Sequence, residues 1–301
     1  MVEAEGRVSG TTTATELRGA ARPARLLELT APPEAVFLRG ELPRGPAVAI
    51  VGTREPSLEG VAFTRRLAAE LAAAGVAVLS GGAKGIDTAA HEGALDVGGS
   101  TVVVAPAGFS RPFPEDNARL FERVVATGGA YLSLYPDHVP ADQAIFFARN
   151  ACLVALADAV IVSQLPARRS GAANAAKWAR QLGRPLFIVP HSPWVTEGGG
   201  ATRELRLGGR PLDRAKDMLK FLRTAGLHAV PLPAQGELWR AADAGPPDAV
   251  LLALRSGASQ TAEIAALTGL SVATVQQRIL TLALSGVLVP GPSGSLKLVT
   301  D

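Results

Sequence analysis

The sequence predicts an α/β protein, an extended Rossmann-like fold with a mostly parallel sheet covered by helices on both faces, followed by a small C-terminal winged-helix domain. Short apolar, β-branched runs alternate with longer Ala- and Leu-rich segments through the central part of the chain. The short runs are almost continuously hydrophobic, as in parallel strands that are buried on both faces. The longer segments repeat apolar residues at spacings of three and four, which is typical of amphipathic helices.

The strands expected in chain order are 47–52, 76–81, 100–108, 130–135, 159–164 and 185–190. The helices expected between and after them are 63–75, 86–98, 117–129, 146–157 and 171–183. Each of the first five strands is therefore followed by a helix. This is the rhythm of the crossover connections that join parallel strands in a doubly wound sheet.

The chain is expected to contain four regions. Residues 1–46 form an entry segment with a short helix, a proline-marked turn and an extended lead-in, and 47–225 form the Rossmann-like domain. A Pro-, Ala- and Gly-rich stretch over 226–246 predicts a linker. Residues 247–301 predict the winged helix, because two helical segments are separated by a short turn and followed by two short strands around PGPSGS.

Composition sets few limits on function. Thirty Lys and Arg against 27 Asp and Glu give a net charge of +3, which permits a nucleic-acid partner without requiring one. The single cysteine, Cys152, excludes a disulfide within the chain and a cysteine-based zinc site, and is expected in the core. No apolar run reaches the roughly 18 residues of a membrane span. The polar N-terminus does not resemble a signal peptide, so a cytoplasmic protein without membrane contact is expected.

The loops that follow the strands are where the sequence places its binding site. In an open parallel sheet, ligands bind at the carboxyl ends of the strands, where helix N-termini point unpaired amides at anions. Three of these loops combine small residues with basic ones: Arg54 after the first strand, Lys84 after the second, and Arg168 with Arg169 after the fifth. Phosphate is the expected ligand of such loops.

The common phosphate-binding motifs are absent from these loops. The first loop has one glycine rather than the G-x-G-x-x-G of dinucleotide-binding proteins, and Lys84 is followed by Gly85 rather than the Ser or Thr of a P-loop. No acid, cysteine or second histidine stands at a spacing suited to catalysis. The sequence therefore predicts neither a cofactor, a metal site nor catalytic residues.

Several segments together resemble the DprA/Smf family of DNA-processing proteins between about residues 25 and 210. They are VAIVGTREPSLEG, VLSGGAKGIDTAAHEGAL, GGSTVVVAPAGFSRPFPEDN, FFARN, SGAANAAKWARQLGRPLFIVP and LLELTAPPEAVFLRGELP. The resemblance implies a non-catalytic protein that binds single-stranded DNA independently of sequence. It also implies a homodimer that helps load the RecA recombinase in natural transformation.

The resemblance and the loop cations together assign DNA binding to Gly52, Arg54, Ser57, Ser80, Gly81, Lys84, Gly85, Asn117, Arg149, Asn150, Arg168, Arg169, Ser170 and Gly171. Arg54 stands at the arginine of the family motif G-x-R-x-x-S/T, and its planar guanidinium is expected to hold a backbone phosphate. Asp87 is expected to cap the helix that it opens. His91 is expected to pack behind the loop as a structural residue.

The chain departs from the family pattern at six positions, and these departures predict weaker DNA binding or a divergent role. Family members usually carry a second arginine at Ala151, a glutamate at Gln164, a threonine at Asn174 and a glycine at His191. They often have a basic residue in the segment occupied here by Glu115 and Asp116. We expect these changes to remove positive charge and add negative charge beside the DNA site.

Two other functions compete with this interpretation. A sensor of a small nucleotide-like ligand, with the winged helix as its output, would use the same phosphate-binding loops. An enzyme similar to cytokinin-activating phosphoribohydrolases would need a P-G-G-x-G-T-x-x-E loop, where this chain has PAGFSRPF.

The second helix of the predicted winged helix begins with Ser271, Ala273, Thr274, Gln276 and Gln277. The positive and negative charges of the predicted winged helix are balanced, which favours protein contact or modest support of DNA binding.

Overall fold

The computed structural model describes residues 14–168, 170–191, 199–227, 250, 253–254, 259–268, 272, 275–276, 279, 288–290 and 296–298. The chain divides into two compact units, residues 1–238 and 239–301. The site predicted from the sequence belongs entirely to the first unit.

The first unit is built on a nine-stranded sheet with the order β1-β2-β6-β5-β4-β3-β7-β8-β9. The strands are β1 (Thr15–Arg18), β2 (Ala35–Gly40), β3 (Ala47–Val51), β4 (Ala77–Ser80), β5 (Thr101–Ala105), β6 (Ala130–Ser133), β7 (Ala159–Val162), β8 (Leu186–Ile188) and β9 (Arg210–Pro211). Strands β3 to β9 pair in parallel, whereas β1 and β2 are antiparallel additions at the β6 edge. The predicted mostly parallel sheet is confirmed.

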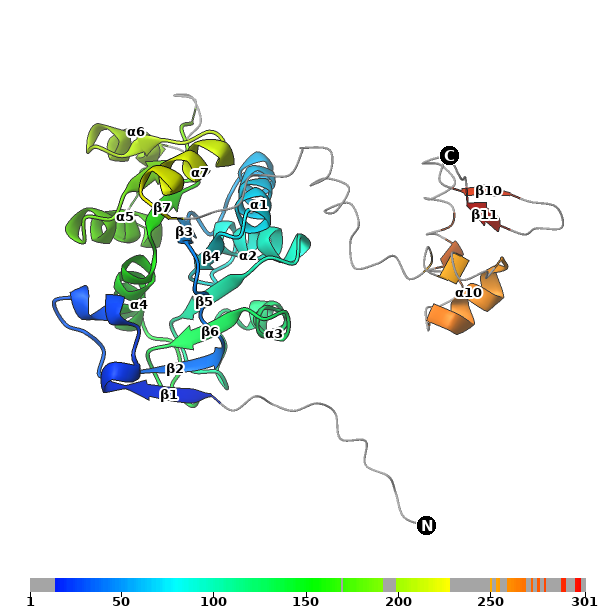
Figure 1. The fold of residues 1–301 in the computed structure, drawn as a ribbon, viewed down its shortest axis with the longest axis horizontal. Coiled ribbons are helices and arrows are strands. Elements are labelled where there is room, and N and C mark those ends of the chain that lie inside the picture. Colours follow the sequence, from blue (N-terminus) through cyan, green and yellow to red (C-terminus); the bar gives the residue numbers. More distant parts are fainter. Residues whose placement is uncertain are drawn as a thin grey trace, which may run out of the picture. The chain divides into compact units, whose positions relative to one another are not determined.

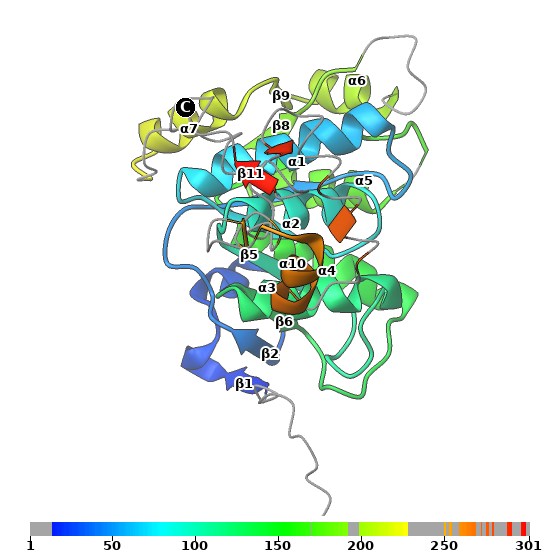
Figure 2. The ribbon, with the colours of Figure 1, turned by 90° about the vertical axis from the view of Figure 1, so that its right-hand side faces the viewer.

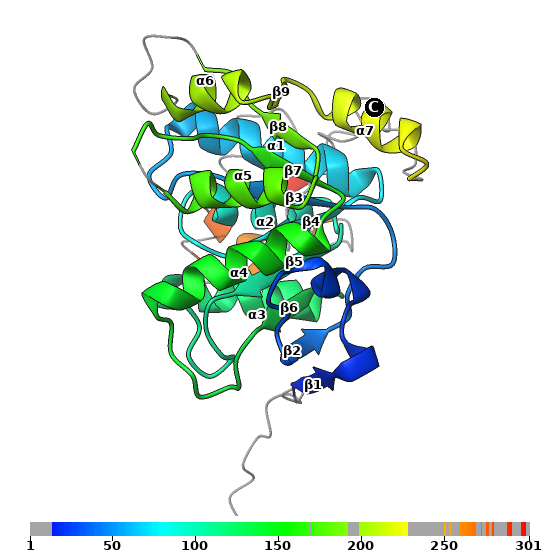
Figure 3. The same ribbon diagram turned by 90° about the vertical axis from the view of Figure 1, so that its left-hand side faces the viewer.

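Helices cover both faces of this sheet (Figure 1). They are α1 (Leu58–Ala73), α2 (Ile86–Asp96), α3 (Ala118–Ala126), α4 (Gln143–Leu156), α5 (Gly171–Gln181), α6 (Gly199–Arg206) and α7 (Ala215–Thr224). Helices α4 and α5 lie across one face (Figure 3), and α1 and α2 lie across the other (Figure 2). The doubly wound arrangement is therefore confirmed.

Strand β3 shows why the short apolar runs carry no polar face. Its residues Ala49 and Val51 belong to the core under α4 and α5, while Val48 and Ile50 belong to the core under α1, α2 and α7. All five residues of the strand are buried. A strand packed between two helical layers needs apolar side chains on both sides, which explains the continuous hydrophobic pattern.

The entry segment is built into the sheet rather than leading up to it. Its strands β1 and β2 pair with each other, and β2 pairs with β6, so the segment extends the sheet by two antiparallel strands. Between them lie two 3₁₀ helices, η1 (Gly19–Ala21) and η2 (Ala24–Glu28). Arg25 of η2 forms an ion pair with Asp158, whose other carboxylate oxygen accepts a 2.8 Å hydrogen bond from the Ala47 amide at the start of β3.

The described part of the second unit contains helix α10 (Thr261–Thr268) and an antiparallel pair of strands, β10 (Leu288–Pro290) and β11 (Leu296–Leu298). A small apolar cluster includes Val250, Leu254, Ile264 and Val275. Of the residues predicted to open the recognition-type helix, all but Gln276 lie outside the described residues. The winged helix therefore stays a prediction.

Cys152 is buried in the core as expected, and burial raises the pKa of its thiol to about 12. Among the described residues, no helix combines the length and apolar character needed to cross a membrane.

Candidate nucleic-acid interface

The strand order reverses between β3 and β7, and the predicted binding residues gather at the carboxyl ends of the strands around this point. Strands β4, β5 and β6 follow β3 on one side, while β7, β8 and β9 continue on the other. The loops 52–57, 81–85 and 163–170, which follow β3, β4 and β7, are here called the loop cluster. This is the position at which open α/β sheets bind ligands.

The first two loops of the cluster interlock through their glycines. A Cβ atom on Gly52 would lie 2.5 Å from the Ile86 side chain, and a Cβ on Gly85 would lie 2.6 Å from the Thr53 carbonyl oxygen. Gly85 also has φ +84°, a conformation that other residues rarely adopt. The Ile86 amide donates a 3.2 Å hydrogen bond to the Thr53 carbonyl. These contacts fix the loop of Arg54 against the loop of Lys84.

Arg54 is exposed and lies beside aromatic rings. Its guanidinium carbon is 5.3 Å from the centre of the Phe146 ring, within the range of a cation–π contact. Phe146 meets Phe113 edge to face, with ring centres 5.3 Å apart. Phe113 and Phe147 are both exposed. Within the described residues Arg54 forms no ion pair, so its hydrogen-bond donors are open to a ligand.

Lys84 is also exposed, but it forms an ion pair with Asp116. Asp116 belongs to η3 (Glu115–Asn117), the 3₁₀ helix that precedes α3. The neighbouring Asn117 is buried and donates hydrogen bonds to the Gly82 carbonyl at 3.0 Å and to the Thr88 hydroxyl at 2.9 Å. Asn117, predicted to bind DNA, therefore holds the Lys84 loop in place with its side-chain amide.

Arg168 connects the two sides of the switch point, the place between β3 and β7 where the strand order reverses. Its Nη2 lies 3.0 Å from a carboxylate oxygen of Glu55, so the ion pair joins the loop after β7 to the loop after β3. Both side chains are exposed. Arg169, the other predicted cation of this loop, lies outside the described residues.

Arg149 lies beneath the loop cluster, where the strands end, and it is only 5% exposed. Its Nη1 donates a 3.0 Å hydrogen bond to the Val104 carbonyl. A Cβ atom on Gly81 would lie 1.6 Å from this nitrogen, so the glycine is required by the packing of the guanidinium. Burial lowers the pKa of Arg149, an effect that the nearby Asp87 opposes. Arg149, which the resemblance assigns to DNA binding, is thus buried in this structure and bonds to the protein itself.

Asp87 does not cap its helix in the expected way. The N-cap of α2 is Gly85, and Asp87 accepts a 3.2 Å hydrogen bond from the Ala83 amide of the preceding loop. Burial raises the pKa of the Asp87 carboxyl, while Arg149 and the Ala83 amide oppose the rise. The carboxyl group therefore ties the Lys84 loop to the start of α2.

Several other predicted DNA contacts bond to the protein itself. Ser80 is fully buried and donates to the Ile50 carbonyl at 2.6 Å. Ser57 and Ser170 cap α1 and α5, accepting hydrogen bonds from the Gly60 amide at 3.1 Å and the Ala173 amide at 3.2 Å. These hydroxyl groups serve the helix N-termini that line the loop cluster.

Asn150 bridges two helices instead of facing the solvent. Its side-chain amide donates to the Gly171 carbonyl and to Asn174 Oδ1, both at 3.2 Å. Gly171 is exposed, and a Cβ atom there would meet only ordinary contacts, the nearest at 3.8 Å. Of the residues assigned to DNA binding, Arg54, Lys84 and Arg168 are thus the described cations that reach the surface.

The departures from the family pattern have different consequences from those expected. Ala151 lies on the opposite flank of α4 from Arg149 and packs into the core, so the missing arginine takes no charge from the loop cluster. Gln164 accepts a 3.1 Å hydrogen bond from the Ser57 amide through its side chain, and its carbonyl accepts one from the Thr53 amide. His191 donates to the Ser163 carbonyl at 3.0 Å. Of the six departures, only Asp116 brings an acid directly to a described cation of the cluster.

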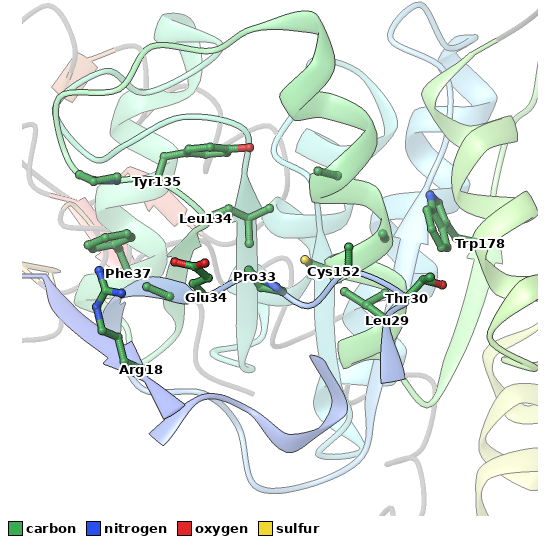
Figure 4. A pocket seen from close by; sticks show the side chains of 15 residues that line it. Arg18, Leu29, Thr30, Pro33, Glu34, Phe37, Leu134, Tyr135, Cys152 and Trp178 are labelled. Atoms are coloured by element: carbon green, nitrogen blue, oxygen red, sulfur yellow. The ribbon is translucent and has the colours of Figure 1, made fainter. Parts of the chain in front are cut away.

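A separate hollow of about 540 Å³ lies on the α4 and α5 face, next to β2. Figure 4 shows Tyr135 and Trp178 at its two ends, with Leu134 and Cys152 between them. Ala151 lines this hollow, and none of the predicted DNA-binding residues does. An arginine at position 151 would therefore have room here, away from the loop cluster.

The aromatic residues next to Arg54 were missed by the sequence reasoning. Phe146 and Phe147 lie near the start of α4, and Phe113 lies in the loop after β5. A signal was available, because two adjacent phenylalanines in one helical turn point in different directions, so one of them must leave the core. Leu58, at the start of α1, is a further exposed apolar side chain beside the cluster.

The predicted structural role of His91 is confirmed. Its ring is fully buried, with Nδ1 2.8 Å from the Thr101 hydroxyl oxygen. Because that hydroxyl donates to the Val78 carbonyl at 2.7 Å, the histidine Nδ1–H must be the donor in the pair.

Within the part of the chain that the structure describes, no group of three or more His, Cys, Asp or Glu residues is arranged to hold a metal ion.

Comparison with known proteins places residues 17–223 in a family described as DNA recombination-mediator protein A. Protein Smf of Synechocystis is 35% identical over 71% of this chain and 54% of its own length. A putative DNA processing protein DprA of Mycobacterium tuberculosis is 40% identical over 63% of this chain and 48% of its own length. The chain thus spans about half the length of these curated relatives.

Two solved structures share the fold. DNA processing protein A from Streptococcus pneumoniae has a TM-score of 0.64 and 30% identity, covering 69% of this chain and 74% of its own. The protein of the same name from Helicobacter pylori has a TM-score of 0.63 and 28% identity, covering 71% of this chain and 98% of its own. The Helicobacter structure was described for its single-stranded DNA binding mode.

Proposed function

The chain belongs to the DNA recombination-mediator protein A family, the DprA/Smf proteins, and from this premise we propose that its loop cluster binds single-stranded DNA independently of base sequence. The binding is non-catalytic and needs no cofactor. The Helicobacter relative that shares this fold supports the choice of ligand, since it binds single-stranded DNA.

The observation that carries the proposal is the position of Arg54. The side chain is exposed at the switch point of the sheet, lacks an ion pair among the described residues and lies over the Phe146 ring. A guanidinium group matches the geometry of a phosphate, while an aromatic ring can stack on a base of any sequence. Cations beside an aromatic surface are the combination expected of a site for unpaired strands.

The cations of the cluster come from three loops and point to the DNA backbone rather than to the bases. Arg54, Lys84 and Arg168 follow β3, β4 and β7, respectively. Side chains that meet phosphates fix the strand without reading its sequence. The second unit is proposed to form a winged helix that supports protein contacts.

The proposed biological role is the delivery of the bound strand to the RecA recombinase during homologous recombination, by a homodimer of this chain. Family membership is the support for both partners. The alternative, a sensor of a nucleotide-like ligand, predicts tight binding of a mononucleotide and no preference for a polymer.

The proposal predicts that the full chain binds oligo-dT with a clear salt dependence. Three phosphate contacts give a slope of about −2 for the logarithm of affinity against the logarithm of salt concentration. Raising the salt from about 50 to about 200 mM should therefore lower the affinity roughly 20-fold. Fluorescence anisotropy measures this, and oligo-dC should behave in the same way. Equal affinity at both salt concentrations would contradict the proposal.

A second prediction concerns Arg54 itself. Arg54→Ala should weaken oligo-dT binding by about 1.5–3 kcal/mol, the scale of a charge-assisted hydrogen bond to phosphate. Arg54→Lys should change the salt dependence of binding little, because lysine keeps the positive charge. It should still lower the affinity, because lysine lacks the planar fork of the guanidinium. Anisotropy titrations measure both variants, and circular dichroism checks that they are folded.

The control for this prediction is Arg44→Ala, which removes an exposed arginine just before the amino end of β3, whereas the loop cluster lies at the carboxyl ends of the strands. The affinity of this variant for oligo-dT should stay within about twofold of that of the parent. If folded Arg54→Ala bound oligo-dT like the parent, the loop cluster would not be the DNA site, and the nucleotide sensor would become the better account.

A further inference from the structure

Two of the three described surface cations of the loop cluster are already occupied by carboxylates of the same chain. Lys84 pairs with Asp116, and Arg168 pairs with Glu55 at 3.0 Å. We propose that Asp116 and Glu55 compete with DNA phosphates for these cations and thereby limit the affinity of the site for strands that reach all three loops. This inference rests on the proposed function and identifies two residues that set its affinity.

The Asp116 carboxylate is held where a phosphate would have to enter. Lys84 and Asp116 are 59% and 68% exposed, so both groups can be reached from solvent. The residue after Asp116, Asn117, is anchored by its bonds to the Gly82 carbonyl and the Thr88 hydroxyl. This anchor keeps the acid beside the lysine loop even when the ion pair opens.

The Glu55 carboxylate occupies the other side of the cluster. Glu55 and Arg168 are 81% and 72% exposed. The Glu55 amide donates a 3.2 Å hydrogen bond to the Thr53 hydroxyl, which fixes its backbone next to Arg54. A phosphate that reaches Arg54 therefore enters the field of Glu55, and a neighbouring phosphate of the same strand can displace it from Arg168.

Exposed ion pairs contribute little to stability, so each carboxylate can be displaced at small cost. A ligand with a single phosphate can bind at Arg54 without displacing either carboxylate. A strand that reaches all three loops has to displace both carboxylates, so it bears the cost of opening both ion pairs. The acids should therefore reduce the affinity of long oligonucleotides more than that of short ones.

The test compares Glu55→Gln, Asp116→Asn and the double variant in the full chain, using oligo-dT of about 5 and about 20 nucleotides. Each single change should raise the affinity for the long strand roughly threefold to fivefold, and the short strand should gain less. The matched control is Glu115→Gln, which removes the same charge from an exposed neighbour that forms no ion pair within the described residues.

Competition for the lysine also predicts coupling, so Asp116→Asn should give no gain in a Lys84→Ala background. Equal gains from Glu115→Gln and Asp116→Asn, an unchanged long-strand affinity, or a gain that survives Lys84→Ala would each overturn the inference. A parent protein that fails to bind the long strand at low salt would instead overturn the proposed function.

Discussion

Arg149→Met is expected to lower the free energy of unfolding by about 3–5 kcal/mol, the cost of removing one partner from a buried pair of charges. Arg149 is 5% exposed, and its loss leaves the Val104 carbonyl without its donor. It also leaves the buried Asp87 without the cation that most opposes the rise of its pKa. Urea unfolding, followed by hydrogen exchange in β4 and α2, measures the change.

The matched control is Arg44→Met, which makes the same substitution at an exposed position and should change stability by less than about 0.5 kcal/mol. Adding Asp87→Leu to Arg149→Met should recover part of the loss, because the second change removes the unpaired acid. An Arg149→Met protein as stable as the parent would show that this arginine is solvated and free to meet DNA.

The stability loss in Arg149→Met should shrink as the pH falls. Burial raises the folded-state pKa of Asp87, and removing Arg149 raises it further. A carboxyl group with a raised folded-state pKa binds its proton more tightly in the folded protein than in the unfolded chain. Acid therefore stabilises the variant relative to the parent, and the difference between them should be smaller at about pH 5 than at about pH 8.

The sequence was a good guide to the sheet and to the loops, because both depend on local patterns. The apolar run of β3 and the glycine that follows it predict a buried strand ending in a turn, and the structure confirms both. Placing Arg54 and Lys84 on neighbouring loops required only the rule that parallel strands end at the same edge.

The roles of individual side chains could not be predicted in this way. A motif identifies Arg149 and Asn117, but their burial depends on packing against β5 and against the Lys84 loop, which are distant in the sequence. The same holds for Ala151, whose position facing the hollow depends on which flank of α4 is turned toward the entry segment. A sequence motif identifies residues that occur together in a family. It does not distinguish the residues that hold the fold from those that contact the ligand.

The entry segment illustrates a second limit. Its strand β2 pairs with β6, almost a hundred residues further along the chain, and antiparallel to it. Nothing in the local pattern distinguishes such an edge strand from an extended connection. Its inclusion matters for the site, because the ion pair of Arg25 with Asp158 and the bond of Asp158 to the Ala47 amide hold the start of β3, the strand that carries Arg54.

Lowering the pH from about 7.5 to about 5 should remove about 2 kcal/mol of stability through His91 alone, with a loss of about 4–5 kcal/mol expected near pH 3. Burial lowers the folded-state pKa of this ring from 6.5 to about 3. Below about pH 6.5 the unfolded chain therefore binds a proton that the folded protein does not bind. The stability that depends on the neutral His91 ring is complete above that pH and is lost as the pH falls.

The hydrogen bonding of the His91 ring explains why the folded protein does not bind the proton. Nδ1–H already donates to the Thr101 hydroxyl, and Nε2 has no partner among the described residues, so a protonated ring would bury an N–H group without an acceptor. In His91→Gln the loss of stability between pH 7.5 and 5 should therefore be smaller than in the parent by about 2 kcal/mol, as measured by urea unfolding across the pH range. The control is His138→Gln, the same substitution at an exposed position. Parallel curves for His91→Gln and the parent would mean that the folded protein accepts the proton at position 91, and that the ring is not sealed behind the loop cluster as the structure has it.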